Sequence, residues 1–216
     1  NYLADDSYLG ALVGRYANRI DKGQFELFDN SYQTDINLGE HCLHGGSDGF
    51  SHKVWKSTIL ATGANPSLML ELISPDGDQG FPGNVSVKVI YTLTEQNTLK
   101  IEYFASSDRT TIFNPTNHSY FNLSGHNSGA VSNHYIQLLA SRFTPTDQSA
   151  IPTGEVIEVD NTAFDFRELT QISQALGSEH QQISYANGLD HNLCLDQYTP
   201  NNQEAKYWGQ AVCNDG

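Results

Sequence analysis

The feature that most constrains the fold is an alternation of apolar and polar residues between positions 85 and 103. Odd-numbered positions from Val85 to Leu93 are apolar, and most of the residues between them are polar. The pattern returns at positions 99, 101 and 103, after the polar stretch 94–98. A period of two residues places one face of a strand toward a core. The two segments therefore predict antiparallel strands joined as a hairpin.

Further short strands are predicted on both sides of this hairpin. Leucines alternate at positions 68, 70 and 72, and segments 135–140, 155–159 and 191–195 are also strand-like. One helix is predicted over 168–176, where an apolar stripe ends at Gly177. The pattern predicts an all-β fold, an antiparallel sandwich or barrel with at most one or two short helices. We expect residues 1–216 to form a single domain, because sandwiches often reach this length.

The charge balance limits the partners of the chain. It has 11 lysines and arginines against 25 acidic residues, which gives a net charge of −14. Such a field repels polyphosphates and anionic membrane surfaces, which argues against nucleic-acid and membrane binding. No stretch approaches the ~20 apolar residues of a membrane span. A neutral small molecule does not feel the net charge and is the favoured class of ligand.

The cysteines indicate the compartment. Cys42, Cys194 and Cys213 are odd in number and widely spaced, which argues against a disulfide framework and for reduced thiols. Residues 1–10 carry no basic region of the kind that begins a signal peptide. We therefore expect a cytoplasmic protein.

Four segments combine polar side chains, glycines and aromatic rings, as functional loops on a sheet scaffold often do. They are GRYANRI at 14–20, HCLHGG at 41–46, NPTNHSYFNLSG at 114–125 and GLDHN at 188–192. Taken singly, each also fits a structural loop whose polar groups are paired internally. Taken together, they supply imidazoles, a guanidinium, a carboxylate and aromatic rings, which are the groups that bind a sugar.

Within these segments, several side chains have more than one interpretation. The guanidinium groups of Arg15 and Arg19 are either solvated or hold ligand oxygens. His41 and His44 with one thiol are a weak zinc signal, so no metal site is predicted. The aromatic candidates for covering the apolar face of a sugar are Trp55, Phe81 and Tyr120.

The segments, in this order, resemble the aldose 1-epimerase (galactose mutarotase) family. The resemblance is carried by GRYANRI at 14–20, LHGGSDGF at 43–50, PDGDQGFPGN at 75–84, NPTNHSYFNLSG at 114–125 and GLDHNLCL at 188–195. It extends through most of the chain, and five ordered motifs are far more specific than any one of them. It implies the large antiparallel supersandwich of galactose mutarotases and a cytoplasmic enzyme that needs no metal or organic cofactor.

The resemblance also implies roles for individual residues. His118 corresponds to the general acid of the family, and Ser119 and Tyr120 lie in the same contact segment. The residues implied to bind the sugar are Asn18, Arg19, His44, His118, Ser119, Tyr120 and Asp190.

One departure from the family pattern concerns the general base. That base is a glutamate, preceded by a sugar-contacting glutamine, well beyond the GLDHN motif, so both would follow residue 216. Glu204 is too close to Asp190 to take the role. The family also has strands ahead of the first motif. We therefore expect a domain that is incomplete at both ends.

The implied activity is the interconversion of α and β anomers of free hexoses such as galactose and glucose, by a monomer or homodimer. A hexose-6-phosphate 1-epimerase on the same fold is an alternative, but only Arg15, Arg19 and Lys22 cluster as cations for a phosphate. A second alternative is a non-catalytic sugar-binding module, which applies if the chain ends at residue 216. Glycoside hydrolysis is disfavoured because it usually needs two facing carboxylates, and only Asp190 is placed by a motif.

Overall fold

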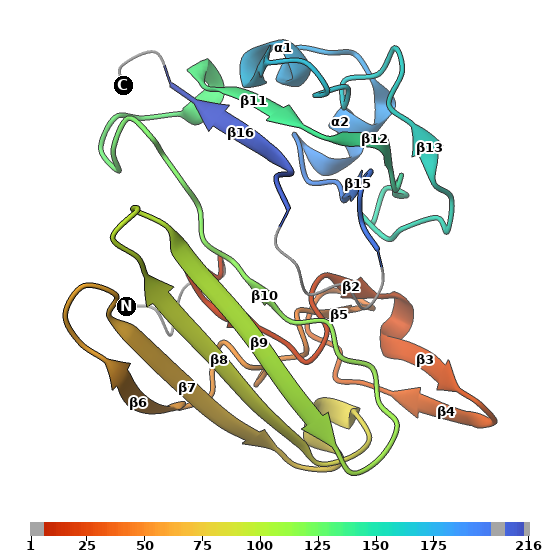
Figure 1. The fold of residues 1–216 in the computed structure, drawn as a ribbon. Coiled ribbons are helices and arrows are strands. Elements are labelled where there is room, and N and C mark those ends of the chain that lie inside the picture. Colours follow the sequence, from red (N-terminus) through yellow and green to blue (C-terminus); the bar gives the residue numbers. More distant parts are fainter. Residues whose placement is uncertain (1–6, 200–205, 214–216) are drawn as a thin grey trace. The chain divides into compact units, whose positions relative to one another are not determined.

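The computed structural model describes residues 7–199 and 206–213. The chain divides into two compact units, residues 1–120 (unit 1) and 121–216 (unit 2). Strands predominate in both units, and all of their named pairings are antiparallel (Figure 1). The predicted all-β class is thereby confirmed. The single domain expected over 1–216 stays a prediction.

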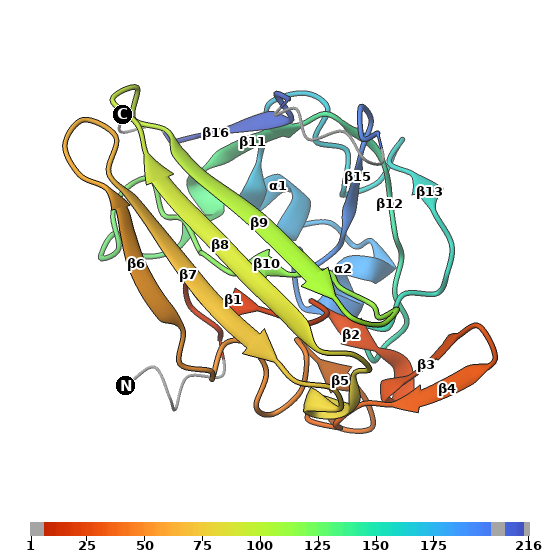
Figure 2. The ribbon, with the colours of Figure 1, turned by 60° about the horizontal axis from the view of Figure 1, so that its bottom comes forward.

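The largest element of unit 1 is a four-stranded antiparallel sheet in the order β6-β7-β8-β9 (Figures 1 and 2). Its strands are β6 (Lys56–Ala61), β7 (Ser67–Ser74), β8 (Val85–Leu93) and β9 (Leu99–Ser107). The predicted hairpin is confirmed as β8–β9, with Leu93 opposite Leu99 and Val85 opposite Ser107. The Thr94 amide closes the turn by donating to the Thr98 carbonyl at 2.9 Å.

One face of this sheet carries the main core of unit 1. Val85, Val87 and Val89 are at most 1% exposed and pack with Leu12 and Phe50. The predicted inward face is therefore confirmed at positions 85, 87 and 89. At the turn of the hairpin the alternating apolar residues are not buried, because Leu93 and Leu99 are about half exposed.

Short strand pairs make up the rest of unit 1. The paired strands are β1 (Leu12–Val13) with β10 (Thr116–Asn117), β2 (Arg19–Ile20) with β5 (Cys42–Leu43), and β3 (Gln24–Leu27) with β4 (Asn30–Gln33). Figure 2 shows the β3–β4 hairpin projecting from the rest of unit 1. Short 3-10 turns lie at Asp21–Gly23 and Asp78–Gly80. A second core joins Ile20 and Cys42 to Phe81.

Unit 2 contains two three-stranded sheets, in the orders β14-β11-β16 and β13-β12-β15. Their strands are β11 (Tyr135–Leu138), β12 (Ala140–Phe143), β13 (Ile157–Glu158), β14 (Thr170–Gln171), β15 (Leu193–Leu195) and β16 (Gly209–Val212). The helices are α1 (Ile172–Leu176) and α2 (Gln181–Ala186), and a 3-10 turn spans Val131–Asn133. Phe143, Val159, Phe164 and Ile183 form the core.

The helix predicted over 168–176 is wrong in its first half. Only α1 is helical, because Thr170 and Gln171 pair with Ile136 and Tyr135 of β11 instead. Gly177 does follow the last helical residue, as expected. Helix α2 was not predicted.

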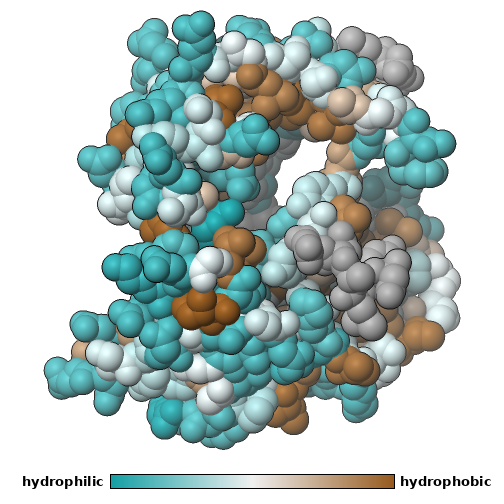
Figure 3. Space-filling model, turned by 180° about the vertical axis from the view of Figure 1, so that it is seen from behind, coloured by the Kyte–Doolittle hydropathy of each residue, from teal (hydrophilic) through white to brown (hydrophobic). Residues whose placement is uncertain are grey.

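One face of the structure is mostly polar. Figure 3 shows hydrophilic residues over most of the visible face. None of the helices in the described part of the chain has the length and apolarity that crossing a bilayer requires.

Candidate functional site

Asn18, Arg19 and His44 form one hydrogen-bonded network at the end of the β2–β5 pair. Arg19 lies opposite Leu43 in the ladder, so Asn18 and His44 face each other beside it. The His44 amide donates to the Asn18 carbonyl at 3.0 Å, and the Asn18 amide donates to Nδ1 of His44 at 3.0 Å. Oδ1 of Asn18 accepts from the amide (2.8 Å) and Nη1 (3.2 Å) of Arg19. Three predicted residues are therefore coupled.

A glycine allows the His44 loop to approach the first motif. Gly45 has φ +89°, and a Cβ placed on it would lie 1.9 Å from the carbonyl oxygen of Gly14. Only glycine permits this backbone contact, since any side chain would meet main-chain atoms. The first glycine after His44 therefore serves the close packing of two motifs.

His118 joins the network through its ring. It follows β10, and its amide donates to the Ala11 carbonyl at 2.9 Å. The ring centroids of His118 and His44 are 5.1 Å apart, with the planes at 81°. The Tyr120 ring lies 5.1 Å from that of His118 on another side. The two imidazoles are therefore in edge-to-face contact, as aromatic pairs prefer.

His44 is neutral near pH 7. Its pKa is lowered to about 4, mainly by burial and in addition by the charges of His118 and Arg19. Because Nδ1 accepts the Asn18 amide, the proton of the neutral ring resides on Nε2. His44 therefore presents a hydrogen-bond donor at Nε2.

The remaining predicted residues lie in two places. Ser119 is exposed next to His118, and its amide donates to Oδ1 of Asn117 at 3.1 Å. Asp190 is exposed and belongs to unit 2, shortly before β15. Contacts within unit 1 thus link five of the predicted residues: Asn18, Arg19, His44, His118 and Tyr120. Asp190 belongs to unit 2.

The residue after Asp190 is firmly anchored in unit 2. Nε2 of His191 is 2.9 Å from Oε1 of Gln182, and its ring centroid is 4.5 Å from that of Phe164. The buried Gln182 side chain also bonds the amide (2.7 Å) and the carbonyl (2.8 Å) of Thr146. The backbone that carries Asp190 is therefore held from the interior.

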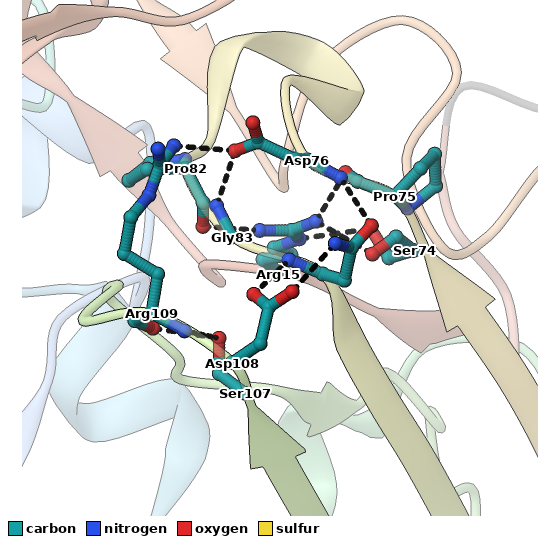
Figure 4. Close-up of polar contacts among 10 residues, drawn as sticks. Arg15, Ser74, Pro75, Asp76, Pro82, Gly83, Ser107, Asp108 and Arg109 are labelled. Carbon is teal, nitrogen blue, oxygen red and sulfur yellow. Dashed lines mark hydrogen bonds and ion pairs between the residues drawn. The ribbon is translucent and has the colours of Figure 1, made fainter.

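Arg15 does not join the site, contrary to the interpretation that it could hold ligand oxygens. It is 2% exposed, and Figure 4 shows its guanidinium enclosed by main-chain carbonyls. Nε donates to Oγ of Ser74 (2.8 Å), Nη1 to the carbonyl of Pro82 (2.9 Å), and Nη2 to the carbonyls of Ser74 (2.9 Å) and Pro75 (2.7 Å). Arg15 therefore ties the 14–20 motif to the 75–84 motif.

One of the three aromatic candidates for the sugar face, Phe81, is also wrong. Phe81 is fully buried and stacks on Phe25. Trp55 packs edge-on against Phe50, and its indole N–H donates to the Phe50 carbonyl at 3.0 Å. Of the three, Tyr120 alone contacts an imidazole of the site.

Sequence reasoning missed Tyr8. Its ring centroid is 4.7 Å from that of His44 and 5.9 Å from that of His118. The residue lies six positions ahead of the first motif, so an isolated aromatic residue was its only signal.

His41 stands apart from this network. Its Nδ1 accepts the Lys22 amide at 3.1 Å. Across residues 7–199 and 206–213, no group of three or more His, Cys, Asp or Glu side chains is arranged to hold a metal ion.

Comparison with known sequences gives consistent matches. The sequence model of the family described as Aldose 1-epimerase matches residues 1–212. The galactose mutarotase of Bos taurus is 43% identical over 194 residues, which are 90% of this chain and 54% of the bovine protein. The aldose 1-epimerase of Haemophilus influenzae is 44% identical over 198 residues, 91% of this chain and 56% of that protein. The chain spans about half the length of the curated relatives it matches.

Solved structures give the same result. The galactose 1-epimerase of Lactobacillus acidophilus superposes with a TM-score of 0.84 at 36% identity, covering 92% of this chain and 58% of that one. An aldose epimerase homologue from C. elegans superposes with a TM-score of 0.81 at 31% identity, covering 93% and 59%. The fold predicted from the sequence is thus confirmed as that of galactose mutarotases.

Proposed function

The chain belongs to the aldose 1-epimerase family, and from this premise we propose that the full-length protein interconverts the α and β anomers of free hexoses. The observation that carries the proposal is the imidazole pair. His44 and His118 have ring centroids 5.1 Å apart, and His44 is hydrogen-bonded to Asn18. A proton donor therefore stands beside a set of polar groups suited to sugar hydroxyls.

In the proposed reaction His118 is the general acid. It donates a proton to the ring oxygen of the sugar while a carboxylate base removes the proton of the C1 hydroxyl. The bond between C1 and the ring oxygen breaks, and C1 becomes the aldehyde carbon of the open chain. Rotation about C1–C2 and the reverse proton transfers close the ring to the other anomer. Each positioned proton-transfer group contributes about 10²–10⁴-fold in rate.

The base is assigned by resemblance. The family pattern places it on a glutamate after residue 216. It must stand on the opposite side of the bond between C1 and the ring oxygen from His118, because both proton transfers accompany the cleavage of that bond.

The other site residues bind and orient the sugar in this proposal. Neutral His44 donates from Nε2 to a hydroxyl oxygen, and the guanidinium of Arg19, held by Asn18, donates to another. Asp190, Ser119 and Tyr120 supply the remaining contacts. A charge-assisted bond from a carboxylate to a hydroxyl is stronger than a neutral one, and fixed orientation converts binding into a productive pose.

The burial of Arg15 favours free hexoses over hexose 6-phosphates. Its guanidinium is engaged by four acceptors at 2% exposure. Of the three clustered cations, only Arg19 and Lys22 remain for a phosphate, in a chain of net charge −14. We expect glucose to bind at least as tightly as glucose 6-phosphate by calorimetry, and a clear preference for the phosphate would favour the alternative substrate.

The experiment that tests the proposal is polarimetry of freshly dissolved α-galactose and α-glucose with the full-length protein. His118→Asn should lower the rate by about 10²-fold or more while sugar binding stays detectable. His52→Asn is the matched control, since His52 is an exposed histidine of the same unit. Near-wild-type turnover in His118→Asn would contradict the assignment of the acid. Binding without any turnover in the unmodified protein would favour the non-catalytic sugar-binding module.

A further inference from the structure

Tyr8 completes a triangle of rings with the two imidazoles. The Tyr8 ring meets His44 edge-on, with centroids 4.7 Å apart and planes at 75°, and lies 5.9 Å from the ring of His118. The third side of the triangle is the 5.1 Å contact between His44 and His118. All three distances fall in or near the range of about 4.5–7 Å that aromatic pairs prefer. A change at Tyr8 therefore reaches both imidazoles at once.

The backbone at Tyr8 is held in an unfavourable conformation. Its φ of 56° lies in the left-handed region, which is an outlier for a bulky aromatic residue. Asn18 and His44 share this feature, with φ of 66° and 53°. A left-handed backbone is unfavourable for a bulky side chain and persists only where the surroundings impose it, often at functional sites.

The surroundings that impose this conformation come from the His118 segment. The Gly10 amide donates to the His118 carbonyl at 3.1 Å, and the Tyr120 hydroxyl donates to the Ser7 carbonyl at 3.1 Å. Within the loop, the Ala11 amide donates to the Tyr8 carbonyl at 3.0 Å. The loop is therefore pinned on both sides of Tyr8 by residues that flank or include the proposed acid.

We propose that Tyr8 is a positioning residue that acts through His44 and His118, its ring holding the two imidazoles at their mutual angle. The inference rests on the proposed function, because the orientation of the imidazoles matters for the reaction only if they bind the sugar and donate to it. The terminal torsion of a histidine is broad, so an unsupported ring samples orientations in which its Nε2 points away from its target. Packing by a third ring removes those orientations.

Exclusion of water is a second consequence of this packing. Burial is the main cause of the low pKa of His44, and the Tyr8 ring is one of the groups in contact with it. The neutral state of His44, with its donor at Nε2, therefore depends in part on Tyr8.

The test compares Tyr8→Phe, Tyr8→Leu and Tyr8→Ala in the full-length protein. Removal of the ring should lower kcat by about 10–100-fold, the usual effect of a displaced catalytic group, with KM changed less than about 3-fold. Tyr8→Phe should restore most of kcat, since the contacts are made by the ring. Tyr32→Ala is the matched control, because it removes another tyrosine of unit 1 that contacts an aromatic ring, on hairpin β3–β4. Tyr8→Leu keeps a large apolar side chain in case Tyr8→Ala does not fold.

Two outcomes would overturn the inference. If Tyr8→Leu or a folded Tyr8→Ala retains kcat within about 2-fold of wild type, the reaction does not depend on positioning of the imidazoles by the Tyr8 ring. If Tyr8→Phe is as impaired as Tyr8→Leu, the effect of Tyr8 comes from its hydroxyl and not from the packing of its ring.

A measurement without turnover separates this inference from the proposed function. The imidazole signals of His44 and His118 are assigned by NMR with His44→Gln and His118→Asn. Tyr8→Leu should weaken the nuclear Overhauser contacts between the two imidazoles, whereas Tyr32→Ala should leave them unchanged. Should the unmodified protein show no mutarotation, the proposed function fails. Weakened contacts in Tyr8→Leu would then still support the positioning role, and unchanged contacts would refute it.

Discussion

Replacing Arg15 with methionine tests whether a buried guanidinium holds two motifs of unit 1 together. Methionine keeps an unbranched apolar stem, which ends at about the position of the arginine Nε, and removes every donor. Three carbonyls, those of Ser74, Pro75 and Pro82, would lose a hydrogen bond that they now accept from Arg15 (Figure 4). Ser74 also loses the bond to its Oγ, but that hydroxyl still donates to Asp78.

The expected loss of stability is about 3–5 kcal/mol. Each buried carbonyl left without a donor costs about 1–3 kcal/mol, which gives an upper limit of about 9 kcal/mol for three. Two effects reduce this figure. Water can reach part of the site, and burial of the charge is itself unfavourable, as the lowered pKa of Arg15 shows. These two effects bring the expected loss to about 3–5 kcal/mol, below the limit set by three unsatisfied carbonyls.

Unfolding of unit 1 can be followed by itself. Trp55 and Trp208 are the two tryptophans of the chain, one in each unit. In a Trp208→Phe background, fluorescence during urea unfolding therefore reports on Trp55, whose ring packs against Phe50 in the core. Arg15→Lys should lie between wild type and Arg15→Met, because it keeps the charge without the planar fork.

Arg109→Met is the control for this experiment. Arg109 forms an exposed ion pair with Asp76, the two side chains being 54% and 50% exposed. Exposed pairs contribute about 0–1 kcal/mol, so this change should cost less than about 1 kcal/mol. If Arg15→Met and Arg109→Met lower the free energy of unfolding by the same small amount, the structural role of the buried guanidinium is refuted.

Two further predictions concern the site. Gly45→Ala should destabilise unit 1 by about 2–4 kcal/mol and impair the proposed mutarotation, because its Cβ would meet the Gly14 carbonyl. Gly63→Ala, with φ +93° and open space around it, should cost only about 1 kcal/mol, and equal losses in the free energy of unfolding by urea would contradict the steric argument. The pKa of His44 is lowered from 6.5 to about 4 in the folded protein. Between these two pH values the unfolded state binds the proton and the folded state does not, so the free energy of unfolding should fall as the pH drops from about 6.5 toward 4. In His44→Gln this part of the pH dependence should disappear, and an unchanged pH profile of the urea midpoint would show that His44 is not buried as a neutral ring.

Local pattern was sufficient for hairpin β8–β9 and for the family. Hairpin β8–β9 follows from an alternation that involves only neighbouring residues, and three of its inward positions are buried as expected. The motifs likewise named Asn18, Arg19, His44 and His118, which the structure joins in one network. These features are encoded over short stretches of sequence, where periodicity and residue type are informative.

Long-range packing decided the features that the sequence left open. Arg15 and Arg19 belong to one motif, yet Arg15 is buried because its acceptors come from Ser74 and Pro82, 59 and 67 positions later. The start of helix α1 was misplaced because Thr170 and Gln171 pair with a strand more than 30 residues earlier. Tyr8 reached the imidazoles, and Phe81 the core, for the same reason. The environment of a side chain depends on segments that meet it only in the folded chain, and residue type or local spacing alone cannot specify it.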